Sequence, residues 1–305
     1  MAVYEQTYKR YKGRLTPEWS RFLIIPRHAY RGIFKSKLFT AFFVLCFIPV
    51  LAEAIFIYLH HNFTALGAMQ MQIRELVPID ASFFETFVVI QLCFSFFLCI
   101  LVGPPQVSMD LRNNALPLYL CRPFSRTEYV VGKMSVLLIL LSFVTWIPQL
   151  LMFLFQSYLE GFTWFTNNLR IGAAIFVSAA VWILLLSLLS QAISALVKWR
   201  VVASGAILGV FFLPWAFGEF INQLFMTRNA SLISLVSVMA DVVQGLFGTL
   251  NLASETRRYR DFEGNIQEIV LLEPSLLLCW TVLFLACIVC LAILSRKVKA
   301  YEVVK

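Results

Sequence analysis

The sequence predicts an all-α integral membrane protein with six transmembrane helices. Two features of its composition lead to this fold class: 60% of the 305 residues are hydrophobic, and only 14% are charged. Soluble domains carry about 25% charged and 45–50% apolar residues, so the composition argues against a soluble enzyme. The 29 Phe residues exclude a disordered chain. The third observation is that the apolar residues gather in runs of about 20, the length that crosses a bilayer.

Six apolar runs are long enough to span a membrane. In chain order they cover residues 38–59, 82–103, 130–155, 169–197, 201–221 and 275–294. The fourth and fifth runs are separated only by Lys198, Trp199 and Arg200, which predicts a tight basic hairpin. Pro49, Pro148 and Pro214 lie within runs, and we expect them to kink the helices.

The distribution of basic residues predicts the orientation. Nineteen of the 25 Lys and Arg residues lie before the first run, after the second, in the 198–200 hairpin and after the sixth. The positive-inside rule therefore predicts that both termini lie on the cytoplasmic side of a cell (inner) membrane. We expect a cytoplasmic tail over residues 1–37, a six-span domain over 38–295 and a basic cytoplasmic tail over 296–305. The net charge of +8 comes from these flanks and not from a nucleic-acid-binding stripe.

The long connection between the fifth and sixth runs, residues 223–273, is predicted to be external. Its apolar positions between Leu232 and Leu250 follow helical spacing, whereas Ser234, Ser237 and Asp241 lie on the opposite face. This pattern predicts an amphipathic helix packed on the bundle or lying at the outer interface. A seventh span over the same residues would place the basic C-terminal tail outside. The charged stretch from 251 to 273 matches no pattern.

The segment before the first run is predicted to form an amphipathic interfacial helix. Thr16, Pro17 and Glu18 are typical of a helix start. The aromatic residues Trp19 and Phe22 then mix with basic residues that include Arg27 and Arg31, a composition that favours the inner membrane surface. The alternative interpretation is a basic flank that only sets the topology.

The connection after the second run, residues 104–129, carries the most informative pattern. Pro104 and Pro105 are expected to end the span, and Ser108 to cap a short helix. Ser125 and Glu128 have capping-box spacing, which predicts the start of the third span. The side chains expected to face the cytoplasm and a docking partner are Asp110, Arg112, Asn113, Asn114 and Arg126. The alternative is an ordinary polar loop.

The stretch NNALPLYLCRPFSRTEYVVGK, residues 113–133, resembles a segment of permease subunits of type 2 ABC transporters. The matching residues are Ala115, Leu116, Tyr119, Leu120, Arg122, Pro123, Ser125, Arg126, Glu128, Tyr129, Gly132 and Lys133. The six runs, internal termini, basic helix and long external segment are similar to that family too. The resemblance implies that residues 110–119 form a cytoplasmic coupling helix on an ATPase, and that Leu116, Tyr119 and Arg122 take part in this coupling. It implies as well that the N-terminal helix contacts the same ATPase. It also implies that 231–250 belongs to the external gate.

The chain carries no ATPase of its own by sequence. The phosphate-binding pattern G-x-x-x-x-G-K-[ST] is missing, because Thr127 precedes Gly132 by five residues and Met134 follows Lys133. If the resemblance holds, ATP and Mg belong to separate nucleotide-binding subunits, and this chain is a non-enzymatic transport subunit. Its other expected partners are membrane lipid and a second copy or a paralogue, which together enclose an export path. Neither catalytic residues, a metal site nor a bound cofactor is predicted.

Polar side chains inside the runs supply the remaining candidates. Glu53 lies well inside the first run, where an unpaired carboxylate costs a few kcal/mol. Gln91 and Gln149 are amides that can bridge helices. Glu53 fits a polar path and a structural hydrogen bond equally well.

The competing functions are a secondary transporter or channel driven by an ion gradient, and a membrane-embedded lipid enzyme. The first needs ionisable groups at the midplane, which only Glu53 offers. The second needs an interfacial cluster of His, Asp or Glu, which the sequence lacks.

Overall fold

The computed structural model describes residues 22–62, 78–113, 126–225, 227–250, 255–260, 266–271 and 274–297. Within these ranges six helices are long and apolar enough to cross a membrane. They are Lys37–His61, Ala81–Asp110, Thr127–Glu160, Leu169–Leu196, Arg200–Phe225 and Leu276–Lys297. Each predicted run overlaps one of these helices almost completely. The predicted helical bundle, with six helices long and apolar enough to cross a membrane, is therefore confirmed among the described residues.

Two of the spans are interrupted near a proline. The first consists of α2 (Lys37–Leu45) and α3 (Ile48–His61), and the third of α9 (Arg126–Val144) and α10 (Trp146–Glu160). Pro49 and Pro148 lie in the first turn of the second piece in each case. Proline cannot donate a backbone hydrogen bond and clashes with the preceding turn, so the helix restarts there. Pro214 differs, because α13 (Arg200–Phe225) continues through it.

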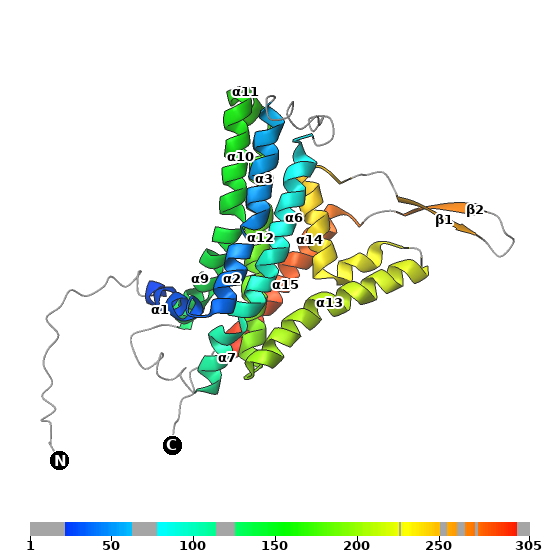
Figure 1. Cartoon of the computed structure of the whole chain (residues 1–305). Helices are drawn as coiled ribbons and strands as arrows, with labels where there is room; N and C mark the ends of the chain where they lie inside the picture. The colour runs from blue at the N-terminus through cyan, green and yellow to red at the C-terminus, as the bar shows by residue number, and fades with distance from the viewer. Residues whose placement is uncertain are drawn as a thin grey trace, which may run out of the picture.

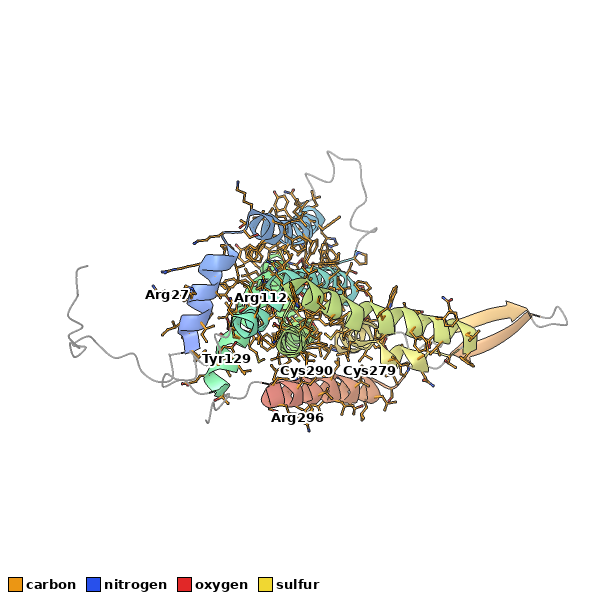
Figure 2. All side chains as sticks on the ribbon, turned by 90° about the horizontal axis from the view of Figure 1, so that it is seen from below. Arg27, Arg112, Tyr129, Cys279, Cys290 and Arg296 are labelled. Atoms are coloured by element: carbon orange, nitrogen blue, oxygen red, sulfur yellow. The ribbon has the colours of Figure 1, made fainter. Side chains whose placement is uncertain are left out.

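The fourth span, α12 (Leu169–Leu196), is the centre of the bundle (Figure 1). It contacts α6 (Ala81–Val102), α9, α10, α13 and α15 (Leu276–Lys297). In its most apolar stretch 61% of the residues are buried, against 22% in α13 and 17% in α15. The peripheral helices therefore present apolar side chains outward, as a lipid-covered surface requires. Figures 1 and 2 show α13 running obliquely away from the other spans.

Two short helices lie at one end of the bundle. They are α1 (Ile24–Ile33), which lies across the bundle axis, and α7 (Pro104–Arg112), which follows α6 (Figures 1 and 2). The tight 198–200 turn between α12 and α13 is at the same end, because Arg112 of α7 stacks on Trp199. We call this end the basic end. The short helix α11 (Phe162–Asn167) lies at the opposite end.

The segment between the fifth and sixth spans contains a packed helix and a hairpin. A 3₁₀ turn, η2 (Asn229–Ile233), leads into α14 (Leu235–Phe247), which buries Val238, Met239, Val242 and Val243. Ser234, which the sequence pattern placed on the polar face, instead caps α14: its hydroxyl accepts the Ser237 N–H at 3.2 Å. At the other end, Gly248 has a left-handed φ of 77°.

The hairpin was not predicted from the sequence. Strands β1 (Glu255–Arg260) and β2 (Ile266–Leu271) pair antiparallel, with Glu255 opposite Leu271 and Arg260 opposite Ile266. Figure 1 shows the pair projecting beyond the helices. The strands belong to the charged stretch whose residues gave no periodic signal.

Candidate functional site

The junction between α6 and α7 at the basic end departs from the expected geometry. Pro104 and Pro105 do not end the helical path; they form the first turn of α7, where a missing N–H costs nothing. Gly103 joins the two helices with helical dihedral angles. A Cβ at this position would overlap the Ser190 hydroxyl of α12 and lie 2.8 Å from the carbonyl oxygen of Cys99. Only glycine allows this close approach between the second and fourth spans.

The start of α7 is fastened to α12 by one hydroxyl group. Ser194 Oγ accepts the backbone N–H groups of Val107 and Ser108, at 3.3 and 2.9 Å, and donates to the carbonyl oxygen of Pro104 at 2.6 Å. Ser108, expected to be the N-cap, instead donates its own hydroxyl back to Pro104. The cap of α7 is thus supplied from another span, which sequence spacing does not reveal.

The end of α7 is tied to α9 through Asp110. Its Oδ2 lies 2.8 Å from Lys133 Nζ and accepts the Tyr129 hydroxyl at 2.8 Å. The side chains of Lys133 and Asp110 are only 10% and 16% exposed. Asp110 was expected to present its charge to a docking partner; instead, internal groups neutralise it. Tyr129 and Lys133 are four residues apart on α9, so both reach the same carboxylate.

The short helix α1 is packed on the same part of α9. A Cβ on Gly132 would lie 2.7 Å from Ile25 Cδ1, so glycine permits the close contact of the two helices. The Tyr30 hydroxyl donates to the carbonyl oxygen of Val136 at 2.7 Å. Burial raises the pKa of Tyr30 to about 12. Thus α7 and α1 both rest on the first turns of the third span.

Apart from Asp110, the predicted outward-facing groups at the basic end that the structure describes are as follows. Arg112 is within cation–π distance of the Trp199 ring, 5.4 Å from its centroid, and Asn113 is exposed beside it. Arg27 and Arg31 are exposed on α1, and Phe22 is partly buried just before it. Arg126 begins α9. The remaining predicted residues, Trp19, Asn114, Leu116, Tyr119 and Arg122, lie outside the described residues.

Sequence reasoning missed several groups that hold this end together. From sequence, Tyr129 stands out only as a matching position. Gly132 and Lys133 stand out also as the Gly-Lys pair of the missing phosphate-binding pattern, and Ser194 and Tyr30 do not stand out. The sequence signal for the first three residues is their spacing: Gly132 and Lys133 follow Tyr129 by three and four residues, so all three share one face at the start of a helix. Asp110 is the acidic residue upstream that this face can meet.

The three predicted intramembrane polar residues form contacts between spans and are almost fully buried. Gln149 Nε2 of α10 donates to Glu53 Oε2 of α3 at 2.9 Å, and both side chains are at most 1% exposed. The second oxygens, Glu53 Oε1 and Gln149 Oε1, have no hydrogen-bond partner among the described residues, and the same holds for Gln91 Oε1. Gln91, Thr145 and Gln149 line one narrow gap that has no room for a water-sized molecule.

Gln91 forms a hydrogen bond to the backbone at the break in the third span. Pro148 has no N–H, so it leaves the carbonyl oxygen of Val144, four residues earlier, without its helical donor. Gln91 Nε2 of α6 donates to that oxygen at 2.7 Å. The amide therefore satisfies a backbone group that the proline exposes, and it joins the second span to the third.

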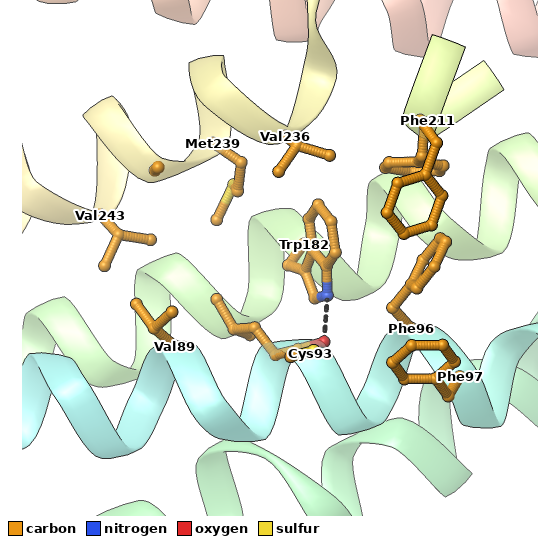
Figure 3. Close-up of a pocket in the computed structure, with 12 residues that line it drawn as sticks. Val89, Cys93, Phe96, Phe97, Trp182, Phe211, Val236, Met239 and Val243 are labelled. Carbon is orange, nitrogen blue, oxygen red and sulfur yellow. Dashed lines mark hydrogen bonds between the residues drawn. The ribbon is translucent and has the colours of Figure 1, made fainter. Parts of the chain in front are cut away.

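An apolar cavity of about 240 Å³ opens between α6, α12, α13 and α14 (Figure 3). Aromatic side chains dominate one wall: the Phe96 and Phe211 rings are 4.8 Å apart, and Trp182 contacts Phe211 at 5.6 Å. The Trp182 N–H is turned into α6, where it donates to the Leu92 carbonyl oxygen and the Ser95 hydroxyl, each at 3.0 Å. With this N–H occupied, the wall offers ring surface to a lipid-like or hydrophobic occupant.

Comparison of the sequence with protein-family models and with curated proteins finds no match.

Proposed function

We propose that this chain is the transmembrane permease subunit of an ATP-driven exporter of the type 2 ABC family. It would act with a second copy or a paralogue and with separate ATP-binding subunits, in a cell membrane with both termini in the cytoplasm. The observation that carries the proposal is α7, a short helix at the basic end that is fastened to spans two, three and four. Its far end presents Met109, Arg112 and Asn113, all exposed.

These attachments suit a helix that transmits force. Span two enters α7 directly through Gly103, Ser194 links it to span four, and Asp110 links it to span three. A partner that pushes on α7 would therefore move three spans together. In contrast, an ordinary polar loop needs neither a cap from another span nor a buried ion pair.

The proposal assigns ATP hydrolysis to the partner. Gly132 and Lys133 form the chain's one Gly-Lys pair, and both serve packing: Gly132 under α1, and Lys133 against Asp110. ATP and Mg would be held by the nucleotide-binding subunits, outside this chain.

The apolar cavity fits the wall of an export path. It lies between α6 and the oblique α13, whose Leu213, Phe217 and Phe220 are 72%, 58% and 61% exposed. A second copy placed against this face would enclose the path, and the lining favours a substrate with a hydrophobic portion.

The decisive experiment identifies the companion. The full-length protein is purified in mild detergent from its own membranes, and the proteins that accompany it are identified by mass. We expect a stoichiometric soluble subunit with a G-x-x-x-x-G-K-[ST] loop. A stable complex without any ATPase would refute the proposal.

The docking surface is then tested by charge reversal. Arg112→Glu should lower the ATPase stimulation by at least about tenfold, since a like-charge contact costs on the order of a few kcal/mol. The matched control is Arg296→Glu, an exposed arginine at the end of α15 and away from α7 (Figure 2). Equal stimulation by both variants, at equal amounts in the membrane, would rule out docking on α7.

A second candidate function is transport driven by an ion gradient, and the Glu53–Gln149–Gln91 cluster is the observation that favours it. A buried carboxyl group with unmatched acceptor oxygens is typical of an ion or proton path. Proteoliposomes without any ATPase would test this: gradient-driven uptake abolished by Glu53→Gln would favour this function over the exporter.

A further inference from the structure

A large crevice lies at the basic end, between α1, the start of α2, the α6–α7 junction and the start of α13. Its volume is about 730 Å³, well within the range of about 300–1,000 Å³ that ligand sites occupy. Gly32 of α1 lines it, and a Cβ built on Gly32 would meet no atom within 4 Å. The crevice is thus open space beside α1, and it is separate from the apolar cavity of Figure 3.

The crevice has an apolar part and a polar part. Ile33, Leu38 and Phe39 line it where the first span begins, and Leu101 and Val102 where α6 ends. The polar lining comes from His28, Ser36, Gln106, Asn113 and Arg200, together with the Asp110–Lys133 pair. A ligand that fills it must therefore carry a hydrocarbon portion next to a polar head.

The polar part has an excess of positive charge. Asp110 and Lys133 neutralise one another at 2.8 Å, which leaves Arg200 as the unbalanced charge among the described residues of the lining. Arg200 is exposed and begins α13, and His28 adds a ring N–H donor from α1. A guanidinium group binds phosphate through paired, charge-assisted hydrogen bonds.

The position of the crevice identifies the source of such a ligand. Spans one, two and five have their ends here, at Lys37, Val102 and Arg200, so the crevice is at the level where acyl chains meet headgroups. Exposed Leu38 and Trp199 border the same level, and Trp is the side chain most typical of this interface.

We propose that this crevice binds an anionic phospholipid from the adjoining leaflet. The phosphate contacts Arg200 and His28, and one acyl chain lies along Leu38, Phe39 and Leu101. The inference depends on the protein spanning a membrane and not on the ATPase, so its failure would leave the proposed exporter untouched.

The first test fills the crevice. Gly32→Phe places a ring in the open space and replaces a helical glycine with a better helix former, so we expect the protein to fold. The matched control is Gly205→Phe on α13, where a Cβ also meets no atom within 4 Å but which does not line the crevice. Native mass spectrometry of protein released from phosphatidylglycerol nanodiscs should show bound lipid for the wild type and the control, and loss of it for Gly32→Phe.

The second test removes the charge. Arg200→Gln should weaken phosphatidylglycerol binding by about tenfold or more, the loss expected for a charge-assisted hydrogen bond. Lys198→Gln, in the same turn but outside the lining, should leave binding unchanged. Equal loss of lipid from both variants, or equal retention of phosphatidylcholine and phosphatidylglycerol, would overturn the proposal. Displacement of the lipid by millimolar inorganic phosphate would also overturn it, because the crevice would then recognise free phosphate.

Discussion

The ion pair between Lys133 and Asp110 allows a quantitative prediction about the basic end. The charged atoms are 2.8 Å apart, and both side chains are mostly buried. At an effective dielectric constant of 20, two unit charges at that distance attract by about 6 kcal/mol, and desolvation offsets much of this. Removing one partner of a buried pair costs about 3–5 kcal/mol; because this pair retains some contact with water, we expect about 3 kcal/mol for Lys133→Met.

The assay is unfolding in mixed micelles by added SDS, followed by tryptophan fluorescence. Asp110→Asn should cost about 2–3 kcal/mol, since Lys133 then loses the negative charge of Asp110 and Tyr129 bonds to a neutral group. The double variant Lys133→Met/Asp110→Asn should cost less than the sum of the two, because it leaves no buried charge alone. Lys35→Met, an exposed lysine at the same end, is the control.

Additive costs in the double variant would contradict this prediction, because additivity means that the two groups do not interact. A wild-type value for Lys133→Met would refute it as well. In either case the ion pair would not hold α7 to α9, and the expected rigidity of the basic end would lose its main support.

Three further predictions test other contacts. The pKa of Tyr30 in the folded protein is about 12, above the ordinary value of 10. The stability that depends on its neutral form is therefore fully present below pH 10 and is lost as the pH rises through 12. Tyr30→Phe should remove this part of the alkaline loss in unfolding titrations. Gln91→Met should lower the unfolding free energy by about 1–2 kcal/mol, and by less in a Pro148→Ala background, where residue 148 supplies the missing N–H. Gly103→Ala should cost about 1–3 kcal/mol, and adding Ser190→Ala should recover part of it; full stability of the single variant would contradict the close packing.

The spans could be predicted because the bilayer imposes them. Each is a run of about 20 apolar residues, and such a run has no other stable placement in a bilayer. The breaks near Pro49 and Pro148 follow equally from the local chemistry of proline. Pro214 shows the limit of that rule, because α13 continues through it.

The attachments at the basic end could not be predicted, because they join residues far apart in the chain. Ser194 reaches Pro104 across 90 residues, and Tyr30 reaches Val136 across 106. Composition and spacing describe a single segment, whereas these bonds depend on how the segments are arranged. Asp110 illustrates the consequence. A charged residue in a polar connection is predicted to be exposed, and only the packed structure shows that Lys133 and Tyr129 contact it.

The length of the second span has a mechanical consequence. Its helical path runs for 30 residues, from Ala81 to Asp110. At 1.5 Å per residue this is about 45 Å, roughly 15 Å more than the hydrocarbon layer. A helix that overhangs the membrane in this way is a lever: a tilt of about 5° displaces the far end of a rod of about 45 Å by about 4 Å. A small tilt of the second span within the bilayer therefore produces a larger displacement of α7. Conversely, a displacement of α7 by a few ångströms tilts the span by only a few degrees.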